Sequence, residues 1–306
     1  MAGMSTAPVA ATVSREAFDR LLVDLRPKLH RYCARMTGSV VDGEDIVQEA
    51  ILKAMVAFRE SAGIDSPESW LFRVAHNAAL DFLRRRNRIE AAHAPEDIDM
   101  LIDPVSATEN REATATSLRT FMRLPTTQRS AVILMDVLGH SLGEIAQVIH
   151  ASIPAVKATL HRGRSRLREL ALEPDDLPSL SLDSATRLRL MDYVDRFNAR
   201  EFDAVRQMLA DDVQLELVNR TRLNGVREVA GRYFHNYNRI DDWKLVAGFV
   251  DRRPAVLVQN PRGPACQWRH FVLLEWTDGL IVNIRDFRYA SYVTECAELQ
   301  TLEVAQ

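Results

Sequence analysis

Residues 124–170 constrain the fold of this 306-residue chain more than any other segment. Residues 141–144, with a serine followed three positions later by a glutamate, form the capping box that starts a helix. His150 and Ala151 then make a turn. Ser152 caps a second helix whose first turn contains Pro154, a position where proline is favoured. Two short helices joined by a tight turn predict a helix-turn-helix.

The second of these helices has two different faces. Val156, Leu160 and Leu167 recur at helical spacing and predict its buried stripe, while the outer side is basic. A helix of this kind enters the major groove of DNA and contacts bases from its first turns. We therefore predict that the following residues contact duplex DNA: Pro154, Ala155, Lys157, Ala158, His161, Arg162 and Arg164.

Positive charge is concentrated in two short segments, although the net charge of the chain is −3. Of the 39 basic residues 35 are arginine, which makes planar, bidentate contacts to phosphate and guanine. Residues 84–88 and 157–168 are rich in these cations, whereas residues 90–112 between them are mainly acidic. This pattern favours two DNA-facing modules joined by a tether that avoids DNA.

The first module, 14–88, has helical periodicity. Within 43–58 the polar face carries Asp45, Gln48 and Glu49. A second helix begins at 66–68, where a serine cap precedes a proline and an acid. Its polar side carries hydrogen-bonding groups and cations, which are the types that contact exposed bases and phosphates. The residues of this helix that we predict to contact DNA are Arg73, Asn77, Asp81, Arg84, Arg85 and Arg86.

The last third of the chain changes to strand-like runs after a break rich in proline, aspartate and serine at 173–184. These runs are 213–218, 243–250, 255–259, 268–276 and 280–289, with a hairpin signal at Asp278-Gly279. Helices followed by a mostly antiparallel sheet predict an α+β domain. The residues that could form a pocket in it are Trp243, His270, Trp276 and Asp286.

Three segments in this order resemble a known family. Residues 43–49 resemble the region 2 motif by which sigma factors dock onto RNA polymerase, and 69–86 resemble the region 2 helix that opens the minus-ten element. Leu124-Pro125, Gln128-Arg129 and 141–170 are similar to region 4, which binds the minus-thirty-five element. The spacing leaves no room for a region 3, as in the extracytoplasmic-function (ECF) group.

This resemblance implies two all-α helical DNA-binding domains, with a region 2 helical bundle and a region 4 helix-turn-helix. Residues 185–292 resemble SnoaL-like domains, which implies a curved-sheet α+β cone. The expected domains are a disordered tail at 1–13, region 2 at 14–90, an acidic linker at 91–116, region 4 at 117–172, a linker at 173–184, the SnoaL-like domain at 185–292 and a tail at 293–306.

The resemblance implies a sigma factor that binds core RNA polymerase through Asp45, Gln48 and Glu49, and that places both basic modules on promoter DNA. It implies no enzymatic activity, and the added domain is expected to modulate activity in cis. An anti-sigma factor is a conceivable partner that the resemblance does not imply.

The sequence contains no pattern that predicts a metal, a cofactor or a membrane as a partner. Its three cysteines share no metal or disulfide spacing, and we expect no metal, no cofactor and a cytoplasmic location. No apolar run reaches the length of about 20 residues that spans a membrane, so we expect no membrane association.

Other interpretations explain less of the chain. The acidic helix face alone could be a solvated surface, and 84–88 alone a cationic helix end that the helix dipole stabilises. A stand-alone helix-turn-helix regulator with a ligand-binding domain would leave 43–49 and 70–86 unexplained. An enzyme acting through the C-terminal pocket would leave the N-terminal half unexplained.

Overall fold

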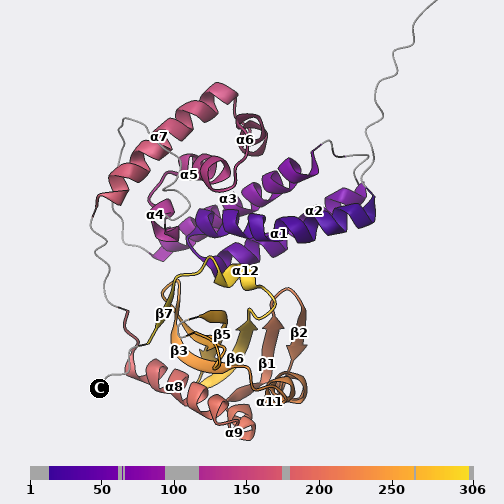
Figure 1. Ribbon diagram of the computed structural model, residues 1–306, viewed down its shortest axis with the longest axis vertical. Helices are drawn as coiled ribbons and strands as arrows, with labels where there is room; N and C mark the ends of the chain where they lie inside the picture. The colour runs from indigo at the N-terminus through magenta and orange to yellow at the C-terminus, as the bar shows by residue number, and fades with distance from the viewer. Residues whose placement is uncertain are drawn as a thin grey trace, which may run out of the picture. The chain divides into compact units, whose positions relative to one another are not determined.

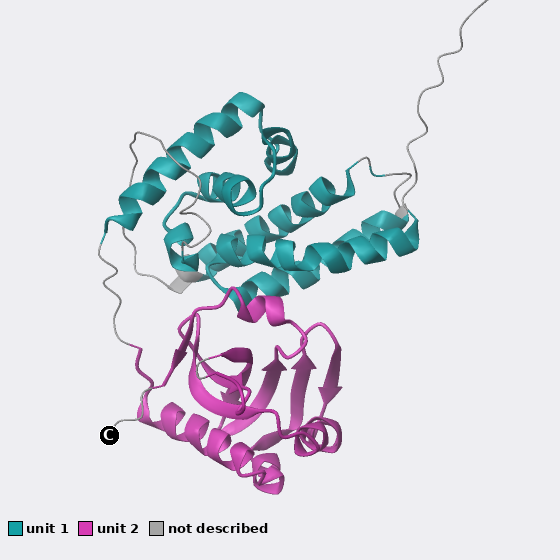
Figure 2. Ribbon diagram, in the orientation of Figure 1, with its two compact units in different colours: residues 1–175 teal, residues 176–306 magenta. Residues whose placement is uncertain are grey.

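The computed structural model describes residues 14–60, 64, 66–93, 117–173, 180–264 and 267–302. It divides into two compact units, 1–175 and 176–306, each with its own hydrophobic core (Figure 2). The expected N-terminal tail and residues 94–116 of the acidic linker lie outside the described residues.

Three long helices form the first half of unit 1 (Figure 1). They are α1 (Arg15–Thr37), α2 (Val40–Glu60) and α3 (Pro67–His93). Ser14 caps α1 by accepting a hydrogen bond from the main-chain N–H of Ala17, and Gly38 ends it in the left-handed conformation that glycine adopts without strain. The predicted helical character of this segment is confirmed, and α3 runs a turn beyond Arg88.

Short helices form the second half of unit 1: α4 (Leu118–Met122), α5 (Thr126–Val132), the π-helix η1 (Ile133–Val137), α6 (Leu142–Ile149) and α7 (Ile153–Ala171). The capping box of α6 is present, with Ser141 Oγ accepting from the Glu144 N–H and Glu144 Oε2 accepting from the Ser141 N–H at 2.7 Å. His150 ends α6 with φ of 54°, in the left-handed region. The predicted helix-turn-helix is therefore confirmed.

One core spans both halves of unit 1, because apolar residues of α1, α2 and α3 pack with those of α4 to α7. Two glycines allow close helix contacts. A Cβ atom on Gly43 would lie 2.6 Å from the main-chain nitrogen of Ala34, and one on Gly163 would lie 2.7 Å from Cγ2 of Val132. Gly43 thus lets α2 approach α1.

Unit 2 is a curved seven-stranded sheet with helices packed against it (Figure 1). The helices are α8 (Ser184–Asn198), α9 (Phe202–Gln207), α10 (Val226–Glu228), the π-helix η2 (Val229–Phe234), α11 (His235–Asn238) and α12 (Ser291–Thr294). The strands are β1 (Leu209–Leu217), β2 (Thr221–Asn224), β3 (Lys244–Val250), β4 (Arg253–Gln259), β5 (Trp268–Thr277), β6 (Leu280–Asp286) and β7 (Leu299–Thr301).

The strand order is β2-β1-β6-β5-β4-β3-β7, and every adjacent pair is antiparallel except β1 and β6. Asp278 and Gly279 have φ of 52° and 84° and form the tight turn of the β5–β6 hairpin. The predicted α+β class and this hairpin are confirmed. Strands β2 and β7 were not predicted. The expected tail at 293–306 contains β7, which pairs with β3 and so extends the sheet.

Helix α8 is fixed to the sheet at its C-terminal end. The Asn198 side chain donates to the main-chain oxygen of Leu245 and accepts from its N–H, both at 2.9 Å. Aromatic rings fill the space between helices and sheet, with Phe197 in edge contact with Tyr237 and Trp243. The N–H of Trp243 donates to the main-chain oxygens of Tyr237 and Ile240, so the single hydrogen-bond donor of this buried indole is satisfied.

Candidate functional surfaces and a polar pocket

The polar face of α2 is accessible. Asp45 is exposed, and Gln48 and Glu49 are half-buried. Lys53 Nζ lies 2.6 Å from Oε1 of Glu49, and Arg85 Nη2 on α3 lies 3.5 Å from its Oε2. The hydrogen bond from Lys53, aided by the charge of Arg85, lowers the pKa of Glu49. Glu49 therefore joins the acidic face of α2 to the basic end of α3.

Two apolar residues continue this face along α2. Leu52 and Val56 lie seven and eleven positions after Asp45, on the same side of the helix, and are 65% and 58% exposed. They were not among the predicted contact residues. Their signal was a pair of large apolar residues on the polar side of an amphipathic helix. We call Asp45, Gln48, Leu52 and Val56 the α2 stripe.

The predicted minus-ten residues on α3 do not all face solvent. Asn77, Asp81, Arg84 and Arg85 are exposed, and Arg73 is half-buried. Arg84 Nη1 lies 3.0 Å from Oδ1 of Asp81. Together with Asn87 and Arg88, three of these side chains line a surface hollow of about 630 Å³.

Arg86 belongs to a different environment from its neighbours on α3. Its Nη1 donates to the main-chain oxygen of Thr37 at 3.0 Å, and its guanidinium lies 5.9 Å from the ring centre of Phe82. A cation at the C-terminal end of α1 is favoured by the helix dipole. The structure thus gives Arg86 an intramolecular role, which differs from its predicted contact with DNA.

The outer face of α7 carries most of the residues that were predicted to contact duplex DNA. Six of the seven predicted residues are exposed: Pro154, Ala155, Lys157, Ala158, His161 and Arg162.

Arg164 is the exception. Its Nε and Nη2 bind the two carboxylate oxygens of Asp136 at 2.9 and 2.5 Å, and the Asp136 side chain is 3% exposed. This bidentate pair raises the pKa of Arg164 and holds α7 against η1. Arg164 therefore has an intramolecular carboxylate partner instead of an open site for DNA.

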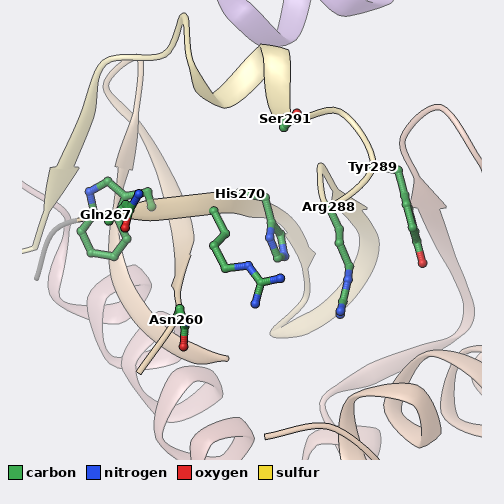
Figure 3. A pocket seen from close by; sticks show the side chains of 8 residues that line it. Asn260, Gln267, His270, Arg288, Tyr289 and Ser291 are labelled. Atoms are coloured by element: carbon green, nitrogen blue, oxygen red, sulfur yellow. The ribbon is translucent and has the colours of Figure 1, made fainter. Parts of the chain in front are cut away.

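A cavity of about 640 Å³ opens in unit 2 at the start of β5 and the end of β6 (Figure 3). Of the four residues predicted to form a pocket, His270 lines this cavity. Trp243 and Asp286 are buried in the core, and Trp276 lies below the guanidinium of Arg189. Further polar residues that line the cavity were not predicted: Asn260, Gln267, Arg269, Arg288, Tyr289 and Ser291.

A buried polar cluster lies behind His270. Asp286, which is 0% exposed, accepts hydrogen bonds through Oδ2 from the hydroxyls of Tyr233 and Tyr237, both at 2.9 Å. Its Oδ1 accepts from the main-chain N–H of Arg288 at 2.8 Å and lies 3.4 Å from His270 Nε2. Burial raises the pKa of both tyrosines, so both remain donors, and burial lowers the pKa of His270.

The described residues contain neither a candidate metal-binding cluster nor a candidate membrane-spanning helix. Within them, no group of three or more histidine, cysteine or carboxylate side chains could hold a metal ion. No helix in the same residues has the length and apolar character needed to cross a bilayer.

Comparison with known proteins follows the division of unit 1. Family models match at residues 21–89, for Sigma-70 region 2, and at residues 118–167, for Sigma-70 region 4. The chain is 29% identical over 217 residues to the ECF RNA polymerase sigma factor SigG of Mycobacterium tuberculosis, covering 63% of this chain and 59% of that protein. It is 33% identical over 159 residues to SigM of the same species, covering 51% and 78%.

The solved structure of SigJ, an extracytoplasmic function sigma factor of Mycobacterium tuberculosis, is similar over 88% of this chain and 95% of that chain, with 21% identity and a TM-score of 0.34. The chain spans less than two thirds of the length of SigG. With the region 2 and region 4 matches, and with an identity of 33% over most of SigM, the chain belongs to the ECF family of RNA polymerase sigma factors.

Proposed function

We propose that this protein binds core RNA polymerase and directs promoter-specific transcription initiation, without catalysing a reaction of its own. The observation that supports this most is that one compact unit carries three separate surfaces. These are the α2 stripe, the polar and basic end of α3, and the exposed face of α7. Each surface suits a different partner: the α2 stripe suits a protein, the end of α3 suits a melted DNA strand, and the face of α7 suits a DNA duplex.

The exposed α3 residues suit single-stranded DNA. Asn77 and Asp81 lie one turn apart, and both offer hydrogen-bonding groups to an unstacked base. Arg84 and Arg85 follow at the next turn and provide positive charge for phosphates. The Arg84–Asp81 pair is exposed, so its exchange for a pair between Arg84 and phosphate costs little, and the Arg85–Glu49 pair is partly exposed.

The exposed α7 residues suit duplex DNA. Lys157, His161 and Arg162 lie within the first three turns of a capped helix, where helix-turn-helix proteins contact base edges. Arg164 instead fixes the orientation of this helix through Asp136. We propose that Arg162, which is exposed, contacts a base or phosphate of the upstream promoter element.

A transcription assay tests this function directly. The full chain would be incubated with bacterial core polymerase and a library of promoter fragments, and run-off transcripts would be sequenced. We expect transcripts whose templates share two conserved elements at fixed spacing. Binding to DNA without association with polymerase would instead support a stand-alone helix-turn-helix regulator. Association with neither would contradict both functions.

We further propose that unit 2 modulates this activity in cis. A folded domain with its own core follows unit 1 after a short connecting segment, 174–183. Removal of the residues after Ser184 should therefore change run-off transcription from the same templates. Equal transcript levels from the full and shortened chains would contradict the modulating role and leave the sigma function intact.

A further inference from the structure

The cavity in unit 2 has a cationic lining. Among the described residues, eight line it; they include two cations, Arg269 and Arg288, and none of the eight is an aspartate or glutamate. Figure 3 shows His270 and Arg288 side by side, with their side chains pointing into the same space, which Asn260 also borders. A cavity of about 640 Å³ has the size of sites that hold small organic molecules.

The two arginines have different partners. Arg269 Nη1 is 2.6 Å from Oδ2 of Asp242 and also donates to the main-chain oxygen of that residue, so its charge is balanced. The guanidinium of Arg288 lies 5.3 Å from the ring centre of Tyr237, and no carboxylate among the described residues forms an ion pair with it. Although its burial acts in the opposite direction, the side chain of Tyr237 and the charge of the nearby Asp286 raise the pKa of Arg288. Arg288 is thus a half-buried cation that makes no direct ion pair with a carboxylate among the described residues.

Asp286 does not fill this role, because its oxygens are already engaged. They accept two tyrosine hydroxyls and the main-chain N–H of Arg288. This buried carboxylate fixes the backbone at Arg288 and faces Nε2 of His270. The cluster thus holds the cavity's cation and imidazole in place before any ligand arrives, which reduces the entropy lost on binding.

We propose that this cavity binds a small organic carboxylate. Arginine binds a carboxylate through two parallel N–H donors, and Arg288 offers them to the cavity. The amides of Asn260 and Gln267 supply further hydrogen bonds, and the ring of Trp268 supplies a flat apolar surface for a carbon skeleton. An inorganic anion would use the cation and the amides but has no carbon skeleton to contact the ring of Trp268. The proposal concerns binding alone and does not depend on the proposed function.

Titration calorimetry on the full chain tests the proposal. The probes are acetate, succinate, benzoate and indole-3-acetate, which sample small, dianionic and aromatic skeletons. Inorganic phosphate is included as an anion without a carbon skeleton. We expect saturable binding of at least one organic probe, weakened at least about tenfold by Arg288→Gln. Arg232→Gln, the same change at an exposed arginine outside the cavity, should leave the affinity unchanged.

A second variant covers the case in which Arg288→Gln fails to fold. Arg288→Lys retains the charge but loses the paired donors, and should give an affinity between those of the native chain and the glutamine variant. Three outcomes would overturn the proposal: no saturable binding of any organic probe, equal affinity in native and Arg288 variants, or phosphate binding as tightly as the best organic probe.

Discussion

Arg129 on α5 donates a hydrogen bond from Nη1 to the main-chain oxygen of Met36, in the last turn of α1, at 2.6 Å. Its Nη2 donates to the main-chain oxygens of Met122 and Leu124 at 3.0 and 2.9 Å. The carbonyls at helix ends have no partner within the helix, and Arg129 satisfies those of both α1 and α4. One buried cation therefore joins the region 2 and region 4 segments of unit 1. Burial lowers its pKa to about 10, so it remains charged near neutral pH.

Replacement of Arg129 by methionine should destabilise unit 1. The variant keeps much of the side-chain volume but leaves three main-chain oxygens without their donor, so the free energy of unfolding should fall by about 2–4 kcal/mol. Urea denaturation followed by circular dichroism measures it. Arg166→Met removes an exposed ion pair with Glu169 and should change stability by less than about 0.5 kcal/mol. Equal effects of the two variants would contradict the role of Arg129.

Gly43→Ala should also destabilise the chain, although alanine is the better helix former. The new methyl group would lie 2.6 Å from the nitrogen and 2.7 Å from the Cα of Ala34, so α1 and α2 would have to separate. Overpacking of this kind costs about 1–3 kcal/mol in free energy of unfolding. Gly143→Ala is the matched control, because its Cβ would meet nothing closer than 4.0 Å. A stable Gly43→Ala variant would show that the helices have room to move.

Asp45→Lys should weaken binding to core polymerase by roughly tenfold, because a cation would replace an anion in the α2 stripe. The affinity can be measured by fluorescence anisotropy with labelled protein at fixed salt. Asp24→Lys makes the same charge change at an exposed position on α1 and should bind normally. If both variants assemble equally well, the α2 stripe is not the docking surface.

Arg162→Ala should weaken promoter binding, whereas Arg164→Ala should lower stability. The loss of exposed Arg162 should weaken binding to a matched promoter by about 1–3 kcal/mol if it contacts a base, with unfolding unchanged. The loss of Arg164 should instead lower the free energy of unfolding, because it leaves Asp136 buried without its partner. Promoter binding and urea denaturation of both variants measure the two effects. Identical profiles for the two variants would contradict this division of roles.

Stability should fall between pH 6.5 and about 4 because of His76. The Tyr32 hydroxyl and Nδ1 of His76 form a buried hydrogen bond of 2.6 Å, and burial lowers the pKa of His76 from 6.5 to about 4. In this interval the unfolded chain binds a proton at this histidine and the folded chain does not, so the free energy of unfolding decreases as pH falls. The stabilisation is complete above pH 6.5, and roughly 2 kcal/mol should be lost at pH 5.

His76→Gln retains an acceptor for Tyr32 but cannot be protonated. The difference in unfolding free energy between pH 7 and pH 5 should therefore be smaller in the variant than in the native chain. His30, whose pKa burial also lowers to about 4, should supply part of the remaining dependence. An unchanged difference in the His76→Gln variant would show that His76 is not the titrating group.

Local signals in the sequence were sufficient for the helical parts of the fold and for one hairpin. The capping box at Ser141, the proline after Ser152 and the Asp278-Gly279 turn each act within a few residues, and the structure has all three. Strand β7 escaped prediction because a three-residue strand is defined by its partner β3, nearly fifty residues away in the chain.

The sequence by itself determined the helix-turn-helix, the amphipathic face of α2 and the change to an α+β domain, because propensity, capping and periodicity depend on near neighbours. Only the tertiary structure decided that Arg164 and Arg86 bind groups within the chain, while Arg162 keeps an exposed position. It also decided that His270 and Arg288 share one cavity. Adjacent arginines look alike in a sequence. The carboxylate, carbonyl or open space that each one meets is set by segments that folding brings together from distant parts of the chain.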